Sequence, residues 1–259
     1  MKAKILPGES SRPELPKYLD PIFQQHAAVY NFCLKYLANK KVLDLGCGSG
    51  FGASQFAGKA KEVLAIDTDA KAITNAKNKY ILSNLKFSVA DISKLDSGVG
   101  PFDAVIALQV IEHLKNYQGF VSLVSQLLVK DGLFILSTPN KARSDFNENP
   151  YHFKEFFPAE LEELLTQYFS RVEIYGLYGN DKVEKYERAR EQRIKNIFRL
   201  DIFKVRKILP RPVLIFLFNL GAIFLRKKLS PVGSLINNLD FVIKPGAADA
   251  LDIIAIGYK

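Results

Sequence analysis

The chain has little cysteine, few histidines and no long apolar run, and these shortages exclude several classes of protein. Cys33 and Cys47 are too few for a disulfide framework. No apolar stretch reaches the roughly 18 residues of a membrane-spanning helix. The first residues, Met1 to Gly8, lack the apolar centre of a signal peptide. We therefore expect a cytoplasmic protein, with possible peripheral contact at the inner face of the membrane.

The length and composition favour a folded enzyme or binding protein. The 259 residues fit one large domain, or one domain with an elaboration, and 48% of them are hydrophobic. The net charge of +9 is concentrated between Lys182 and Lys228, where fourteen Lys and Arg face four Asp and Glu. Such a segment favours an anionic partner, either phospholipid headgroups, a phosphorylated substrate or nucleic acid, although it also fits a solvated helix face.

A glycine-rich stretch, Val42 to Gly52, is the strongest motif in the chain. An apolar run ends at Asp44-Leu45, and glycines then follow at every second position from 46 to 52. This pattern predicts a buried strand, a tight turn and a helix whose first N–H groups are open to a ligand. A dinucleotide fingerprint needs its third glycine at position 51, where Phe51 stands, so the spacing argues against an oxidoreductase.

Strands and helices alternate along the rest of the chain. Apolar runs predict strands at 62–67, 86–92, 102–108, 132–140, 172–177 and 251–257, with a shorter one at 241–246. Helical spacing is found at 20–38, 51–58, 70–79, 117–130, 158–169 and 181–203. The alternation predicts an α/β fold: a Rossmann-like, seven-stranded, mostly parallel sheet with helices on both faces.

Acidic residues end two of the predicted strands: Asp67 ends the strand at 62–67, and Asp91 lies at the end of the strand at 86–92. Asp67 lies where this type of fold places a carboxylate on ribose hydroxyls, while Asp69 is placed to cap the next helix. The first helix, capped by Asp20, precedes the glycine strand and can lie across a cofactor pocket. Tyr30 on that helix could touch the ligand, or could serve in ordinary packing.

The order of these motifs resembles class I S-adenosylmethionine-dependent methyltransferases over residues 20–178 and 251–258. That resemblance implies S-adenosyl-L-methionine as cofactor. Asp67 would take the ribose hydroxyls, Asp91 would meet the adenine amino group and Ile92 would lie against the ring. Leu108 and Gln109 would line the end of the fourth strand near the sulfonium. The residues bordering the methionine part would be Asp44, Gly46, Gly48 and Gly50.

A second set of motifs narrows the resemblance. Gln109 to Leu114, Ser137 to Asn140 and Tyr151 to Phe156 resemble the subgroup of ubiquinone-pathway and sugar O-methyltransferases. They also resemble small-RNA 2′-O-methyltransferases, which hold a divalent metal with a Glu-x-x-Glu-His sequence and a later histidine.

By that resemblance, Glu112, His113 and His152 would be catalytic residues, and the same three would be the ligands of a divalent metal ion. Gln109 stands where those RNA enzymes have their first glutamate. A hydroxyl acceptor needs a base or a Lewis acid, and these three side chains could supply either. The alternative interpretations are structural: a helix-terminus His113, a Glu112 bound to backbone, and a His152 paired with a nearby acid.

The leading functional hypothesis is O-methylation of a hydroxyl on a small or lipid-linked molecule, such as a sugar, glycan or quinone precursor. The first alternative is an RNA 2′-O-methyltransferase. The second is a non-catalytic protein that binds the cofactor. The oligomeric state and the identity of the acceptor are not specified by any pattern.

We expect three parts: a methyltransferase core with its N-terminal helix at 1–180, a helical lid or interface insertion at 181–247, and the final core strand at 248–259. Within the insertion, residues 213–225 are almost wholly apolar, with basic residues on both sides. A helix there is too short to cross a bilayer, so the segment is expected to serve as a lid, a dimer surface or a membrane contact through 206–228.

Overall fold

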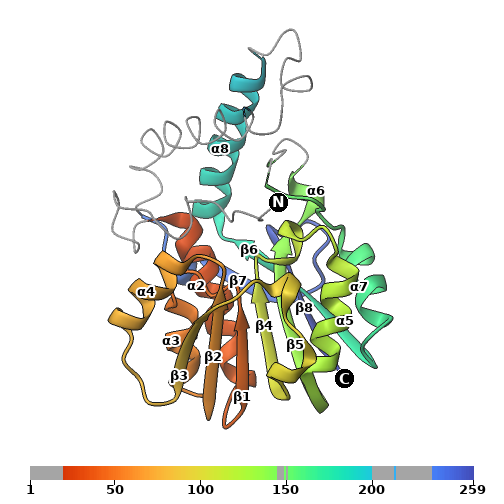
Figure 1. Cartoon of the computed structure of the whole chain (residues 1–259). Coiled ribbons are helices and arrows are strands. Elements are labelled where there is room, and N and C mark those ends of the chain that lie inside the picture. The colour runs from red at the N-terminus through yellow and green to blue at the C-terminus, as the bar shows by residue number, and fades with distance from the viewer. Residues whose placement is uncertain (1–19, 145–148, 150, 200–212, 214–234) are drawn as a thin grey trace.

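The computed structural model describes residues 20–144, 149, 151–199, 213 and 235–259. The fold is the Rossmann-like α/β fold predicted from the sequence (Figure 1). One sheet runs in the order β3-β2-β1-β4-β5-β8-β6-β7. Its strands are β1 (Lys41–Leu45), β2 (Glu62–Asp67), β3 (Leu85–Val89), β4 (Phe102–Leu108), β5 (Leu128–Pro139), β6 (Arg171–Gly179), β7 (Phe241–Pro245) and β8 (Asp252–Tyr258).

All neighbouring strands from β3 through β5 in the sheet order are parallel. The strand β8 enters antiparallel between β5 and β6, and β7 pairs antiparallel with the outer side of β6. The sheet therefore has eight strands, one more than expected, because the short 241–246 strand joins it as β7. The start of β8 consequently lies at the same edge as the carboxyl ends of β1, β2, β4 and β5.

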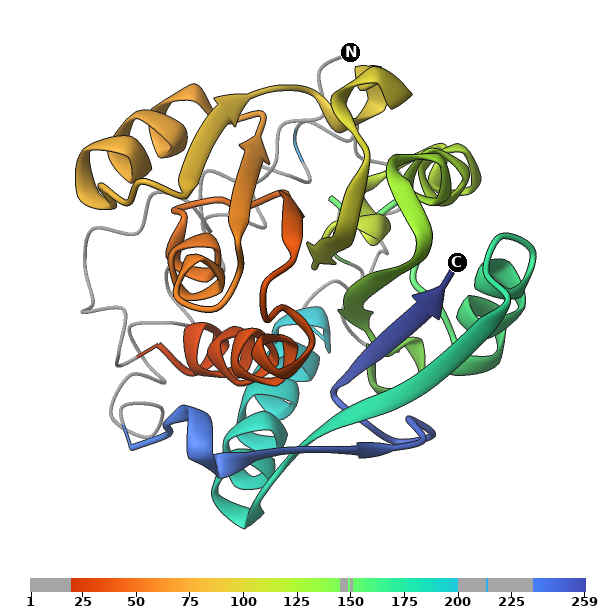
Figure 2. The ribbon, with the colours of Figure 1, turned by 90° about the horizontal axis from the view of Figure 1, so that it is seen from below.

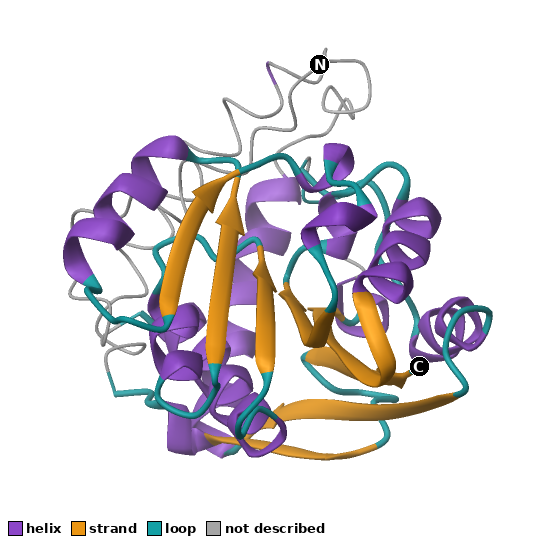
Figure 3. Cartoon of the chain, turned by 60° about the horizontal axis from the view of Figure 1, so that its bottom comes forward, coloured by secondary structure: helices purple, strands orange, loops and turns teal. Residues whose placement is uncertain are grey.

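Helices cover both faces of the sheet (Figures 2 and 3). The helices of the described residues are α2 (Pro21–Cys33), α3 (Phe51–Ala57), α4 (Ala70–Lys79), α5 (Tyr117–Leu127), α6 (Lys141–Ser144), α7 (Pro158–Thr166) and α8 (Asp181–Arg199). Single 3-10 turns connect them: η2 (Leu34–Tyr36), η3 (Ile92–Lys94), η4 (Ser97–Val99), η5 (Ile111–His113) and η7 (Asn238–Asp240).

The two faces bury separate hydrophobic clusters. Val42 of β1 belongs to the cluster that includes side chains of α2, α3 and α4. Its neighbours Leu43 and Leu45 belong to the cluster beneath α5 and α7. This near-continuous apolar pattern is expected of a parallel strand that is covered on both sides.

Three predicted helix ends need correction. The helix expected over 158–169 ends at Thr166. The helix expected over 20–38 is α2 followed by the 3-10 turn η2, with Asp20 as the N-cap as expected. The helix expected over 117–130 ends at Leu127, and β5 begins at Leu128. The Asp131-Gly132 stop signal lies inside β5 instead, where Asp131 adopts a φ of 61° in a locally irregular pairing with β4.

The segment between β6 and β8 contains α8, η7 and β7. Figure 1 shows α8 rising from the side of the sheet on which the arrowheads of β4 and β5 lie. Apart from Val213, the apolar 213–225 stretch and its basic flanks at 206–228 lie outside the described residues. Among the described helices, none is long and apolar enough to cross a membrane.

Candidate functional site

The glycine turn between β1 and α3 is shaped by three left-handed residues. Gly46, Gly48 and Gly50 have φ values of 77°, 51° and 74°. A Cβ on Gly46 would lie 2.6 Å from Val110, and one on Gly50 would lie 2.7 Å from Phe87, whereas Gly48 faces open space. The first and third glycines are therefore needed for packing, and Gly48 is where a ligand can approach bare backbone.

The fourth glycine of the motif serves the fold. A Cβ on Gly52 would collide with the ring of Tyr30. That ring also packs against Phe51 and Phe56, with centroids 5.9 and 5.6 Å away. Tyr30, one of the cofactor residues suggested by the sequence, thus lies on α2, and its ring packs against α3 beside the glycine turn.

Asp67 braces the turn from the end of β2. Its Oδ2 accepts a hydrogen bond from the Gly48 N–H at 2.8 Å, and its Oδ1 accepts one from Asp69 at 2.8 Å. Asp69 caps α4, as expected, by accepting from the N–H groups of Lys71 and Ala72. Burial raises the pKa of the Asp67 carboxyl, against the opposing effect of these backbone bonds.

Asp44 carries the clearest sign of a missing polar partner. It is 2% exposed, and its Oδ2 is the one buried side-chain oxygen or nitrogen, among the residues described, that has no hydrogen-bond partner. Burial, and then the nearby Asp67 charge, raise the pKa of this carboxyl to about 7. An orphaned carboxylate oxygen is costly, so this atom suits a cationic ligand group such as an ammonium.

The other predicted cofactor residues lie at neighbouring strand ends. Asp91 caps the turn η3, where its Oδ1 accepts from the N–H and the hydroxyl of Ser93, and the hydroxyl bond chiefly lowers its pKa. Ile92 and Leu108 are buried. Gln109 directly follows β4 with a φ of 57°, and its side-chain nitrogen donates to the Ser137 hydroxyl at 3.3 Å.

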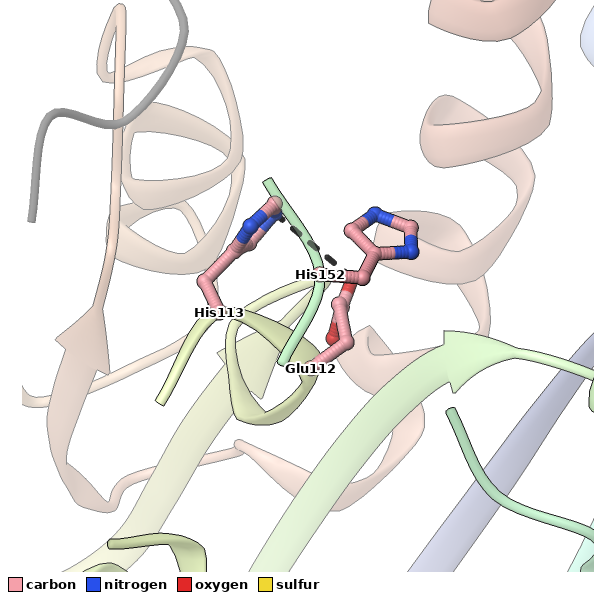
Figure 4. Close-up of side chains that lie close together, drawn as sticks. All are labelled: Glu112, His113 and His152. Carbon is pink, nitrogen blue, oxygen red and sulfur yellow. Dashed lines mark ion pairs between the residues drawn. The ribbon is translucent and has the colours of Figure 1, made fainter. Parts of the chain in front are cut away.

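Glu112, His113 and His152 come together as the sequence predicts (Figure 4). One potential ligand atom from each lies within 4.8 Å of the others. The imidazole centroids are 5.0 Å apart, and His113 Nε2 is 3.9 Å from Glu112 Oε1. The second Glu112 oxygen accepts a hydrogen bond from Thr138 at 3.0 Å.

Backbone pairing holds this cluster. Glu112 is in η5, directly after β4, and its carbonyl accepts the Phe153 N–H at 2.7 Å. That bond fixes the 151–156 segment beside η5 and so brings His152 to His113. The His113 Nδ1 lies 3.3 Å from the Tyr151 carbonyl, which fixes the proton on Nδ1 and leaves Nε2 with its lone pair.

His152 is held by polar neighbours on both ring nitrogens. Its Nδ1 lies 2.6 Å from Glu155 Oε1, and its Nε2 lies 2.9 Å from the Asn149 side-chain nitrogen. Since the Asn149 amide donates, the consistent arrangement is a neutral ring with its proton on Nδ1 and an accepting Nε2. The paired acid anticipated as a structural alternative is therefore present, and the accepting lone pair of the ring lies on Nε2.

Comparison with known proteins decides the family. A family model described as a methyltransferase domain matches residues 37–199. A probable S-adenosylmethionine-dependent methyltransferase of Mycolicibacterium smegmatis is 34% identical over 179 residues, which cover 67% of this chain and 68% of that protein. The chain belongs to the S-adenosylmethionine-dependent methyltransferases.

Further relatives agree with this family. A probable S-adenosylmethionine-dependent methyltransferase of Mycobacterium tuberculosis is 32% identical, over 69% of this chain and 66% of its own length. A ubiquinone biosynthesis O-methyltransferase of Rickettsia akari is 29% identical, over 63% of this chain and 70% of its own length. This methyltransferase therefore matches only about two thirds of the length of its mycobacterial relatives.

Solved structures support the fold over most of the chain. A Thermotoga maritima methyltransferase, titled a possible histamine N-methyltransferase, aligns with a TM-score of 0.58, 12% identity and 92% coverage of both chains. At that identity the likeness concerns the fold alone.

The residues of this methyltransferase fit its cofactor. S-adenosylmethionine carries an ammonium, a carboxylate, a sulfonium and a ribose. The orphaned Asp44 oxygen suits the ammonium, and the open backbone at Gly48 allows close approach. Asp67 has lone pairs left for hydroxyl donors beyond the two backbone bonds it accepts.

Sequence reasoning missed several residues at this site. Asp252 begins β8 and is 2% exposed, and Gln25 of α2 donates to its Oδ2 at 2.7 Å. Thr138 and Glu155 bind Glu112 and His152. The Thr138 and Glu155 contacts were foreshadowed by the motifs that contain these residues, but nothing in the sequence links positions 25 and 252.

Proposed function

We propose that this enzyme methylates a hydroxyl group on a small or lipid-linked acceptor, such as a sugar, a glycan or a quinone precursor. The observation that carries the proposal is the arrangement of Glu112, His113 and His152 at the carboxyl edge of the sheet. The name of the Rickettsia relative supports oxygen as the accepting atom. Because the family is one of methyltransferases, the non-catalytic alternative is not carried further.

The proposed chemistry needs alignment and removal of a proton. When bound, S-adenosylmethionine supplies a methyl group on a positively charged sulfur. The protein aligns the acceptor oxygen with that methyl group and accepts the hydroxyl proton. His152 Nε2 accepts the proton, while Glu155 at Nδ1 holds the tautomer and stabilises the imidazolium that forms.

Asn149 must release His152 Nε2 for this step, since it now lies 2.9 Å from that atom. Its place would then be taken by the acceptor hydroxyl. The Thr138 hydroxyl keeps one Glu112 oxygen in place, which directs the other toward His113. These contacts fix the orientation of each group before the acceptor binds.

The same three side chains could hold a divalent metal ion. Nitrogen and carboxylate oxygen donors suit Zn²⁺ and related metals, and the contacts to Tyr151 and Glu155 are the orienting partners that metal-bound imidazoles usually have. A metal here would polarise the acceptor hydroxyl in place of a base.

Replacing His152 tests the proposal. His152→Ala should lower kcat for methyl transfer roughly 100-fold or more, because it removes the proton acceptor or one metal ligand. The dissociation constant for S-adenosylmethionine, measured by calorimetry, should change little. Normal turnover would refute the role of His152, and equal loss of cofactor binding would indicate a structural one.

A chelator separates base from metal in the same assay. If the cluster works through a metal, dialysis against a chelator should abolish turnover, and adding back one kind of divalent metal ion should restore it. Full activity after chelation, with no bound metal found by elemental analysis, would leave His152 as a base. RNA is included among the acceptors, because the Glu-His-His cluster also resembles that of RNA 2′-O-methyltransferases.

A further inference from the structure

A buried acid that was not among the predicted site residues lies at the carboxyl edge of the sheet. Asp252 is the first residue of β8, opposite Pro139 at the end of β5 and Leu177 on β6. The antiparallel direction of β8 places this residue where β4 and β5 end. Only 2% of the residue is exposed to solvent.

The direct hydrogen-bond partner of Asp252 is a neutral amide: Gln25 of α2 donates from Nε2 to its Oδ2 at 2.7 Å. The Gln109 side chain is near enough to lower the pKa of Asp252. Two charged residues of α8, Glu187 and Arg190, influence Asp252 with opposite signs. They are paired with each other at 2.8 Å, so the positive charge of Arg190 is largely offset.

A carboxylate in this environment lacks full compensation. Burial is the main cause that raises the pKa of Asp252 to about 7, while the bond from Gln25 and the nearby Gln109 side chain oppose the rise. A buried charge normally requires a partner of opposite sign, and a positive group arriving nearby would favour the ionised form.

Asp252 is linked to the cofactor site through Gln109. Gln109 precedes Val110, and Val110 lies so close to Gly46 that a Cβ on the glycine would be 2.6 Å from it. The Gln109 N–H donates to the Ser137 carbonyl at 2.9 Å, its side chain donates to the Ser137 hydroxyl, and the same side chain lowers the pKa of Asp252. Asp252 therefore lies near the residue that precedes Val110, at the edge of the sheet that also carries the glycine turn.

We infer that Asp252 is a specificity-determining residue that favours the positively charged cofactor over its neutral product. S-adenosylmethionine has a sulfonium, whereas S-adenosylhomocysteine has an uncharged sulfide, and the two otherwise share their ionised groups. Asp44 acts on the ammonium that both molecules possess. The second buried carboxylate, Asp252 at the start of β8, acts on the charge that methyl transfer removes, so it stabilises the donor and lets the product leave.

The inference is tested by binding, without any acceptor. Calorimetry would give dissociation constants for S-adenosylmethionine and S-adenosylhomocysteine with wild type, Asp252→Asn and Asp252→Ser at about pH 8, where the native carboxyl is ionised. Loss of the charge should weaken S-adenosylmethionine about tenfold and S-adenosylhomocysteine less than about threefold. Equal weakening of both ligands, or no weakening of either, would overturn the proposal.

A matched variant separates a local charge effect from a general one. Asp103→Asn neutralises a carboxylate at the opposite edge of the sheet, where Asp103 accepts the Lys41 N–H at 2.7 Å. It should leave the ratio of the two dissociation constants near the wild-type value, and a change as large as that of Asp252→Asn would contradict a local effect.

Proton release from the wild-type protein gives a readout that does not depend on a folded variant. At about pH 7, binding of S-adenosylmethionine should release more protons than binding of S-adenosylhomocysteine, measured by calorimetry in two buffers of different ionisation enthalpy. The groups that influence Asp252 are the same in both measurements, namely Gln25, Gln109, Glu187 and Arg190. Equal proton release would count against the proposal. Failure of His152→Ala to affect turnover would leave this result untouched.

Discussion

Asp44 shows how a single residue reveals a ligand site. Its unbonded Oδ2 is destabilising in the protein alone, and a cationic ligand group would remove that cost. The same atom makes the stability of the free enzyme depend on pH. The folded-state pKa of about 7 lies above the ordinary aspartate value of 3.8, so the folded chain binds this proton more tightly than the unfolded chain.

The direction of this pH dependence follows from the raised pKa of Asp44. The contribution of Asp44 is fully present below about pH 4 and is lost as the pH rises through about 7. Asp44→Asn should therefore stabilise the cofactor-free protein by roughly 1–3 kcal/mol at about pH 8, with little change at about pH 4. Urea unfolding of wild type and variant at the two pH values measures this change in the free energy of unfolding. The variant should also bind S-adenosylmethionine more weakly, and a variant destabilised at the higher pH would contradict the assignment.

Residue-scale geometry was only partly predictable. The glycine turn and Asp67 follow from local spacing, because a short turn between a strand and a helix constrains nearby residues. The bond between Gln25 and Asp252 joins positions 227 residues apart, and it exists only because β8 inserts antiparallel between β5 and β6. No local pattern encodes such a contact.

At the scale of elements, η7 connects β7 to α8. Asp240 accepts hydrogen bonds from the side chains of Asn180 and Lys182 and from the Asn237 N–H. The Asn237 N–H bond is the largest of the causes that lower the pKa of Asp240. The return of the chain into the sheet through β7 therefore rests on one carboxylate and its donors.

Neutralising Asp240 should loosen this connection. Asp240→Asn should reduce the free energy of unfolding by about 0.5–1 kcal/mol near neutral pH, a small effect because the ion pair is partly exposed. A lowered pKa gives stability that is present above the unfolded value of 3.8 and lost as the pH falls through the folded value. The difference from wild type should vanish in strong acid. Faster amide exchange confined to β7 and η7 would support this role, and unchanged exchange there would not.

The elements themselves were largely predictable from apolar periodicity, and the errors have physical causes. Asp131-Gly132 resembles a helix stop, yet it forms an irregular bend within β5, so α5 ends three residues earlier than expected. The edge strand β7 was expected as a short strand but not as part of the sheet. Pairing partners depend on the tertiary arrangement, which periodicity does not contain.

Across the whole molecule, charge is distributed unevenly. The chain carries a net charge of +9, yet the carboxyl edge of its sheet gathers buried acids from four elements, namely Asp44, Asp67, Glu112 and Asp252. This edge is where ligands bind in open α/β sheets. The positively charged methyl donor therefore binds at an acidic site within a basic protein, and methyl transfer converts its sulfonium into an uncharged sulfide.

The identity of the methylated atom tests the central claim most directly. The enzyme would be incubated with S-adenosylmethionine carrying a ¹³C-labelled methyl group and with sugars, quinol precursors, lipid-linked glycans or RNA, and each product would be examined by NMR. The account predicts a labelled methyl group bonded to oxygen, formed by wild type and greatly reduced with His152→Ala. A label bonded to nitrogen, sulfur or carbon, or an O-methyl product formed equally well without His152, would contradict it.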